Sequence, residues 1–133
     1  MIWKWLKRIL LGVSAAVFAL VAVFAGFIIY DSVTSDSSAE FANITFTDKD
    51  GNTLIGYLAE PDTAGPHPAI LLIHEWWGLN EGMTILADAL AEQGYVVLAA
   101  DAYRGNVTES IPRAIWLVTT TSEAQTTSDL DAG

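Results

Sequence analysis

The sequence contains no cysteine, only two histidines, and few basic residues beyond its first eight positions. Without cysteine, these 133 residues cannot form a disulfide, a thiolate metal site or a cysteine nucleophile. Three of the six basic residues precede Ile9, and every acidic residue lies at Asp31 or later. Residues 31–133 therefore hold three basic and sixteen acidic residues, a net charge of −13. Such a chain offers no basic surface for phosphates, which argues against a nucleic-acid partner.

Charge is also absent from Ile9 to Tyr30, where 19 of the 22 residues are apolar. As a helix this stretch would extend about 33 Å, which matches the roughly 30 Å hydrocarbon core of a bilayer. Trp3, Trp5 and Tyr30 bracket it, and aromatic residues prefer the two membrane interfaces. The sequence therefore predicts a transmembrane anchor over residues 9–30 and argues against a purely cytosolic protein.

The charges on either side of this anchor predict its orientation. Residues 1–8 form a basic flank and the far side is acidic, so the positive-inside rule places the N-terminus in the cytoplasm. The rest of the chain would then lie on the exported side, periplasmic or extracellular. A cleaved signal peptide is the alternative, although its apolar run usually has only about 7–15 residues. Residues 31–40 are polar and serine-rich, which predicts a short flexible linker.

The remaining residues, 41–133, predict one small α/β domain. Residues 41–47 and 53–60 alternate between apolar and polar around an Asp-Gly turn, as in an antiparallel hairpin. Residues 69–73 and 95–100 are apolar on both faces, which is typical of parallel strands covered by helices. Apolar residues at helical spacing lie between these two strands, so the predicted order is hairpin, then strand–helix–strand.

Capping residues set the expected helix ends. We expect Asn80 to begin the helix between the two parallel strands and Gly94 to end it. Pro112 is expected to open a short helix that reaches Thr119. Beyond it the chain is polar and threonine-rich, and a further helix is expected to begin near Thr127.

The segment IHEWWGLN, from Ile73 to Asn80, follows a predicted parallel strand, where α/β folds bind ligands. His74 and Glu75 begin like the zinc motif H-E-x-x-H, but the fifth position is Gly78 and the segment does not lie on a helix, so no metal site is predicted. Gly78 and Gly82 have the spacing of a serine-hydrolase elbow, G-x-S-x-G. The residue at its centre is Asn80, which cannot act as a nucleophile.

HEWWGLN after an apolar strand, followed by a helix and by GYVVLAADAYRG, closely resembles the dienelactone hydrolase family of α/β-hydrolases. The resemblance covers residues 41–104 and extends toward Gly133. It implies hydrolysis of esters and lactones by a Cys–Asp–His triad, without a metal or organic cofactor. It also implies an incomplete α/β-hydrolase sheet: the chain is expected to be the N-terminal half of such an enzyme, to stop before the nucleophile elbow and to be inactive alone.

The same resemblance implies roles for residues of the HEWWGLN segment, residues 74–80, here called the tryptophan loop. Glu75 matches the family glutamate that contacts the nucleophile in the resting enzyme, and the Trp76 backbone N–H matches one donor of the oxyanion hole. This role suits the chemistry, because acyl transfer builds negative charge on a carbonyl oxygen. Trp77 is expected to line the substrate pocket. The alternative for Glu75 is a solvated loop carboxylate.

Four further residues follow the second parallel strand. Asp101 is expected to tie its loop together through hydrogen bonds. Tyr103 and Arg104 are expected to border the substrate. Arg113 falls near a family arginine that holds a substrate carboxylate, and a solvated helix arginine is its alternative.

Two functions remain open from the sequence. The first is a membrane-anchored, dienelactone-hydrolase-like enzyme that acts on a small-molecule ester or lactone through a covalent acyl-enzyme. The second is a non-catalytic, membrane-anchored module that binds a partner or ligand through the tryptophan loop. The lack of a nucleophile favours the module, whereas Glu75 and the oxyanion-type loop favour the enzyme.

Overall fold

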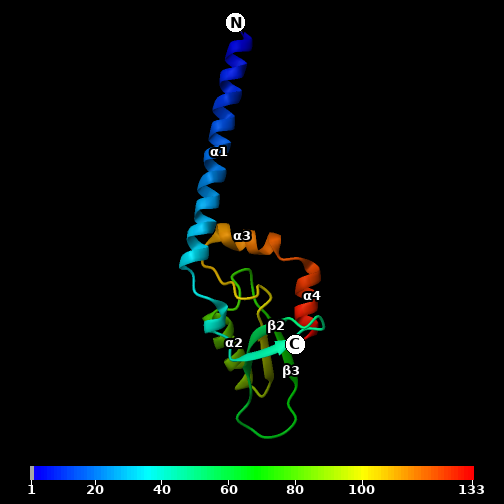
Figure 1. Cartoon of the computed structure of the whole chain (residues 1–133). Coiled ribbons are helices and arrows are strands. Elements are labelled where there is room, and N and C mark those ends of the chain that lie inside the picture. The colour runs from blue at the N-terminus through cyan, green and yellow to red at the C-terminus, as the bar shows by residue number, and fades with distance from the viewer. Residues whose placement is uncertain (1) are drawn as a thin grey trace.

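A computed structural model describes residues 2–133 as a long N-terminal helix attached to a small domain with a four-stranded sheet (Figure 1). Its elements in chain order are α1 (Ile2–Thr34), a short 3-10 helix η1 (Ser38–Glu40), β1 (Ile44–Thr47), β2 (Thr53–Ala59), β3 (Ala69–Ile73), α2 (Glu81–Ala91), β4 (Val96–Ala100), α3 (Ile111–Thr120) and α4 (Glu123–Asp131).

The sheet has the strand order β1-β2-β4-β3. Strands β1 and β2 form the antiparallel hairpin, and β2 pairs antiparallel with β4. Strands β3 and β4 are parallel, in register from Ala69 opposite Val96 to Ile73 opposite Ala100. The predicted α/β class, with a hairpin followed by strand–helix–strand, is therefore confirmed. Strand β3 lies at the edge of the sheet.

Helix α2 covers one face of the sheet, and both of its ends are where the sequence predicted them. The Asn80 side chain accepts a hydrogen bond from the Met83 N–H, and the helix ends before Gly94, which adopts φ +94°. Ala87 packs on Val97 of β4, so small side chains bring helix and sheet close together. This packing fixes the start of α2, and with it the loop that follows β3.

Helix α1 projects away from the sheet (Figure 1). By length and composition it is able to cross a membrane, and its apolar window is fully exposed in the structure. A signal sequence near an N-terminus meets the same test. The structure thus supplies the helix that the apolar run predicted, from Ile2 to Thr34.

Residues 31–40, predicted as a flexible linker, contain the end of α1 and the short helix η1, and two of their polar residues are buried against the domain. Helix α1 continues to Thr34, and Asp31 within it is 8% exposed. Ser38 is fully buried, and its hydroxyl donates to the carboxylate of Asp101, 2.6 Å away. These polar residues therefore pair with groups in the domain instead of remaining solvated.

Of the two helices after β4, the start of α3 agrees with the prediction and the start of α4 does not. Helix α3 includes Pro112 in its first turn, as predicted. Helix α4 begins at Glu123, several residues before the expected start, because the Ser122 hydroxyl caps it by accepting from the Gln125 N–H at 3.1 Å.

Candidate active site

His74 joins the loops that follow β3 and β4. Its Nε2 accepts a hydrogen bond from the Ala102 N–H at 3.1 Å, so this nitrogen carries a lone pair. Its Nδ1 therefore holds the proton and donates to the Glu75 carbonyl oxygen at 2.7 Å. The side chain is 3% exposed. Both ring nitrogens thus hold backbone groups, and among residues 2–133 no group of three or more metal-ligating side chains is present.

Trp76 and Trp77 occupy the centre of a tight turn over residues 75–78, here called the tryptophan turn. The Gly78 N–H closes this turn on the Glu75 carbonyl oxygen at 3.2 Å. Gly78 adopts φ +90°, and a Cβ atom at this position would lie 2.5 Å from the Asn106 carbonyl oxygen. Only glycine therefore allows this turn to pack against the loop that precedes α3.

A second contact fixes the same turn from the other side. The Thr108 N–H donates to the Trp77 carbonyl oxygen at 3.0 Å. Together with the approach of Asn106 to Gly78, this bond locks the turn to residues 106–108. The conformation of the turn is therefore fixed by contacts with residues 106–108 as well as by the hydrogen bond within the turn.

The Trp76 backbone N–H donates no hydrogen bond to any of residues 2–133. Its indole is 38% exposed and meets the Trp77 ring edge to face, with centroids 4.8 Å apart. The Glu75 side chain is also exposed. The structure therefore brings together three predicted site residues in one turn: an N–H donor, a carboxylate and an aromatic pair.

Asp101 has the structural role expected from the sequence. Its Oδ2 accepts from the Ser38 hydroxyl and the Gly105 N–H, both at 2.6 Å, and its Oδ1 accepts from the Tyr103 N–H at 3.0 Å. The residue is 2% exposed. These three bonds shape the loop after β4 and leave little of the carboxylate for a ligand.

Tyr103 lies beside His74, with ring centroids 4.6 Å apart. Burial raises the pKa of the Tyr103 phenol above its ordinary value of 10.0. The phenol therefore stays protonated at neutral pH and is able to donate a hydrogen bond. The contact with His74 brings Tyr103 next to the residue that anchors the tryptophan turn.

The two predicted substrate arginines are both engaged by other side chains. Arg104 donates to the two carboxylate oxygens of Asp129, at 3.0 Å from Nε and 2.6 Å from Nη2, and its Nη2 is 3.5 Å from Asp48. The hydrogen bond to Asp129 raises the pKa of Arg104. Arg113 donates from Nη2 to the Asn106 side chain at 2.7 Å.

Arg113 also forms an ion pair with Asp31, with 3.5 Å between Nε and Oδ2. Arg104 thus holds α4 and the hairpin turn to the loop after β4, and Arg113 holds α3 to α1. The structure places neither guanidinium in the tryptophan turn.

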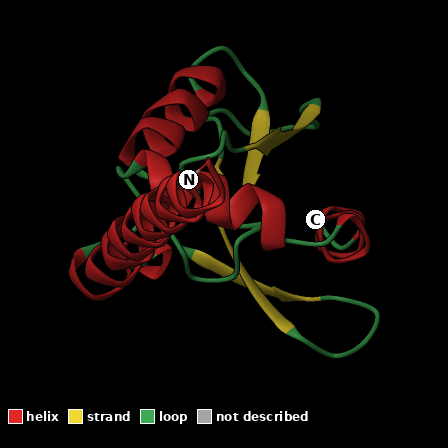
Figure 2. Cartoon of the chain, turned by 90° about the horizontal axis from the view of Figure 1, so that it is seen from above, coloured by secondary structure: helices red, strands yellow, loops and turns green. Residues whose placement is uncertain are grey.

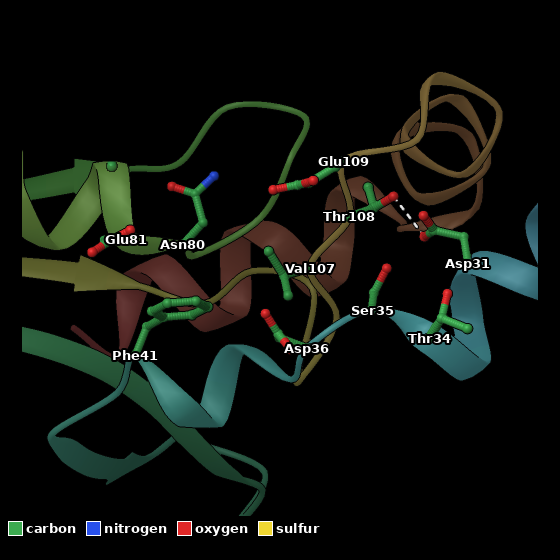
Figure 3. Close-up of a pocket in the computed structure, with 11 residues that line it drawn as sticks. Asp31, Thr34, Ser35, Asp36, Phe41, Asn80, Glu81, Val107, Thr108 and Glu109 are labelled. Atoms are coloured by element: carbon green, nitrogen blue, oxygen red, sulfur yellow. Dashed lines mark hydrogen bonds between the residues drawn. The ribbon is translucent and has the colours of Figure 1, made fainter.

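A cavity of about 550 Å³ lies at the start of α2, next to Asn80 and Glu81 (Figure 3). It is lined by the end of α1, the start of α2 and the loop before α3. Four acidic residues lie on its wall together with Phe41: Asp31, Asp36, Glu81 and Glu109. No motif in the sequence indicates this cavity, because its lining residues come from three distant segments.

The sequence model of the dienelactone hydrolase family matches residues 54–132. A homologue from Aquifex aeolicus named carboxymethylenebutenolidase is 39% identical over 66 residues, which are 47% of this chain and 28% of that protein. A homologue of the same name from Saccharolobus solfataricus is also 39% identical, over 61 residues, 46% of this chain and 23% of the relative.

The fold agrees with these sequence matches. A crystal structure assigned to the dienelactone hydrolases, from Klebsiella pneumoniae, superposes with a TM-score of 0.57 at 30% identity. The superposition covers 68% of this chain and 42% of that one. The chain thus spans less than half the length of these relatives. With its family match over more than half of its residues, the chain belongs to the dienelactone hydrolase family.

Proposed function

We propose that this chain supplies the N-terminal part of a membrane-anchored hydrolase that cleaves ester or lactone bonds in a small molecule. The relatives named carboxymethylenebutenolidase support a lactone as the substrate class. The observation that carries the proposal is the Trp76 N–H, which has no partner among residues 2–133 and lies in a turn fixed on both sides.

The proposed chemistry is acyl transfer. A nucleophile outside residues 31–133 attacks the substrate carbonyl carbon, and the electron pair of the C=O bond moves to the oxygen. The Trp76 N–H donates to this oxyanion, whose charge develops only as the reaction proceeds. The alkoxide then leaves, which for a lactone opens the ring, and water hydrolyses the acyl-enzyme.

Other residues of the turn have supporting roles in this proposal. Glu75 lies next to the N–H donor and is exposed, which suits a carboxylate that contacts the resting nucleophile. Trp77 and Tyr103 offer aromatic surface for the substrate. Arg104 and Arg113 remain proposed substrate contacts, although in this structure their guanidinium groups bind carboxylate and amide oxygens of the protein.

The proposed topology places residues 1–8 in the cytoplasm and the domain on the exported side. The basic flank before Ile9 and the acidic chain after Tyr30 support it. Protease added outside intact spheroplasts should degrade the chain beyond Asp31. Protection of the domain under these conditions, with digestion only after permeabilisation, would reverse the topology.

The nucleotide sequence downstream of the Gly133 codon provides the first test of the catalytic proposal. We expect the codons after Gly133 to encode G-x-[CS]-x-G within a few tens of residues, followed by an aspartate and a histidine. A stop codon directly after Gly133 would instead favour the non-catalytic binding module.

A variant that removes only the proposed donor provides the kinetic test. Trp76 follows the first residue of the turn, a position that accepts proline, so Trp76→Pro deletes the N–H and keeps the turn. In the full-length hydrolase we expect kcat for a p-nitrophenyl ester to fall by roughly 10²–10³. The matched control, Trp76→Ala, also loses the indole but keeps the N–H. Equal kcat values for the two variants would contradict the oxyanion role.

A further inference from the structure

Helix α3 exposes an unusually apolar surface for the outside of an acidic domain. Its sequence, IPRAIWLVTT, contains one charged residue, Arg113, whose side chain is 12% exposed and directed to Asp31 and Asn106. Ala114 and Leu117 are the buried residues of the helix. The exposed apolar residues are Ile111, Ile115, Trp116 and Val118, which are 56%, 42%, 48% and 50% exposed.

Three of these side chains form one stripe, and Trp116 widens the exposed surface. At 100° per residue, Ile111, Ile115 and Val118 lie within about 60° of one another, and Trp116 lies about 100° beyond Ile115 on the side away from the buried residues, with Pro112 and Thr119 between them. The outward face therefore carries no charge, although residues 31–133 together carry −13. Exposed apolar surface of this extent indicates a partner.

The position of α3 indicates which partner. Figure 1 shows α3 lying across the end of α1, at the point where α1 leaves the domain, and Figure 2 shows it extending sideways from α1. The ion pair between Arg113 and Asp31 fixes this arrangement. Asp31 follows Tyr30, the last residue of the apolar run. The start of α3 therefore lies level with the end of the apolar run.

We infer that the outward face of α3 docks into the exported-side surface of the lipid bilayer, beside α1. This inference rests on the proposed anchoring by α1, which would bring α3 to the membrane surface. The face is uncharged, so burial of apolar side chains drives the contact. Trp116 suits this depth, since tryptophan prefers the interface.

Docking of α3 would fix the orientation of the domain on the membrane. One anchor helix alone leaves the domain free to tilt about the point where it enters the bilayer. A second contact through α3 removes this freedom, and α3 is joined to the tryptophan turn by the loop that carries Thr108. The proposed active site would then be held at a constant distance from the lipid surface.

Single-cysteine labelling tests the inference, because residues 1–133 contain no cysteine. The full chain is reconstituted in phosphatidylcholine nanodiscs, and a bimane probe is attached to Ile115→Cys or, in a second variant, Val118→Cys. Ile85→Cys is the matched control, because Ile85 is an exposed residue of α2, 61% exposed. Val17→Cys, within α1, reports on the anchor itself.

Two quenchers distinguish the outcomes. Lipids with a nitroxide headgroup should quench the probe at Ile115 or Val118 at least threefold more than at Ile85, and aqueous iodide should show the reverse. Equal quenching by iodide at Ile115, Val118 and Ile85 would overturn the inference. Protection from iodide without quenching by the nitroxide lipid would also overturn it, since a protein surface would then cover α3.

The anchoring is read separately in the same samples. Quenching at Val17 by lipids with a nitroxide on the acyl chain, combined with free iodide access at Ile115, would refute docking of α3 and retain the anchor. Free iodide access at Val17 would refute the anchor and therefore the basis of the inference. Circular dichroism of each labelled variant should show unchanged helix content, because all of these positions are exposed.

Discussion

The Thr108 hydroxyl donates a 2.6 Å hydrogen bond to the buried Asp31 carboxylate, while the backbone N–H of the same residue donates to the Trp77 carbonyl oxygen at 3.0 Å. One residue thus connects the end of α1 with the tryptophan turn. Thr108 is itself 2% exposed, so water cannot replace these bonds without a change in the fold. The proposed anchor and the proposed oxyanion donor are therefore parts of one packed unit.

The Thr108→Val variant should be less stable than the natural chain by about 1–3 kcal/mol, because it removes a buried hydroxyl that donates to Asp31 and accepts from the Ser110 N–H. Thr108→Ser keeps the hydroxyl and should lose only about 0.8 kcal/mol, the contribution of one buried methyl group. Urea unfolding of the full chain in detergent, followed by tryptophan fluorescence, measures both values. Equal stabilities of the two variants would show that the hydrogen bond to Asp31 contributes nothing.

Substitution of Gly78 should be more costly than substitution of a glycine with the same backbone conformation in open space. Gly78 has φ +90° and Gly94 has φ +94°, but only at Gly78 would a Cβ atom clash, 2.5 Å from the Asn106 carbonyl oxygen. Gly94→Ala should cost about 1–2 kcal/mol for the left-handed conformation alone. Gly78→Ala should cost a further ~1–3 kcal/mol for the forced shift of the loop.

The same urea experiment compares the two alanine variants. Gly94→Ala serves as the control for backbone strain, since nothing lies within 4 Å of its added Cβ. If Gly78→Ala proved no more destabilising than Gly94→Ala, the close packing of the tryptophan turn on Asn106 would be wrong.

Stability in acid should depend on Asp48 in the hairpin turn. Its Oδ2 accepts from the Asn52 side chain at 2.7 Å, and its Oδ1 accepts from the N–H groups of Asp50 and Asn52 at 2.9 and 2.8 Å. These hydrogen bonds, the Asn52 side chain first, lower the pKa of Asp48 below its ordinary value of 3.8. A carboxyl with a lowered folded-state pKa stabilises the fold above its unfolded-state pKa, and this stabilisation is lost as the pH falls through the folded-state value.

We therefore expect the free energy of unfolding to fall as the pH decreases from about 5 to about 3, and to fall less steeply in Asp48→Asn. Asn52→Ala removes the first cause of the lowered pKa and should give an intermediate slope. Urea unfolding at several pH values measures the slopes. An Asp48→Asn slope equal to that of the natural chain would contradict a contribution from this carboxyl.

Local patterns in the sequence were sufficient for most elements of the fold. The two-sided apolar strands, the Asn80 cap and the stop at Gly94 depend on neighbouring residues, and all three were predicted correctly. The linker and the start of α4 were predicted less well. A serine such as Ser38 occurs both in solvated linkers and in packed segments, so its burial cannot be inferred from its neighbours. The partner of Ser38 is Asp101, which is 63 residues away in the sequence.

In the candidate site, too, the features made by adjacent residues were predictable and those made by distant residues were not. The motif HEWWGLN indicated the tryptophan turn, because a turn forms from adjacent residues. The partners of the two arginine side chains were not predictable. Arg104 pairs with Asp129 on α4, 25 residues later, and Arg113 pairs with Asp31 on α1. Pattern and resemblance give the type of residue at a site, but the partner of a long charged side chain depends on the tertiary structure.

The open edge of the sheet leads to the last prediction. Strand β3 pairs only with β4, and between Ala69 and Ile73 it carries neither charge nor proline, the usual protections of an edge strand. Its outer residues Leu71 and Ile73 are 40% and 56% exposed. Beside them an apolar hollow of about 490 Å³ extends over the sheet face opposite α2, toward Leu98. Each exposed leucine or isoleucine forgoes roughly 1.5–3 kcal/mol of burial, against a total stability of about 5–15 kcal/mol for a small domain.

We therefore expect residues 31–133, expressed without the anchor, to self-associate. Ile73→Lys places a charge beside the open edge and should reduce association in light scattering, because charge blocks strand pairing. Ile85→Lys changes the net charge by the same amount on α2, where no edge exists, and should leave association unchanged. A monomeric fragment with a sharp cooperative melt would mean that β3 needs no further neighbour, and it would favour the self-contained binding module over part of a larger hydrolase.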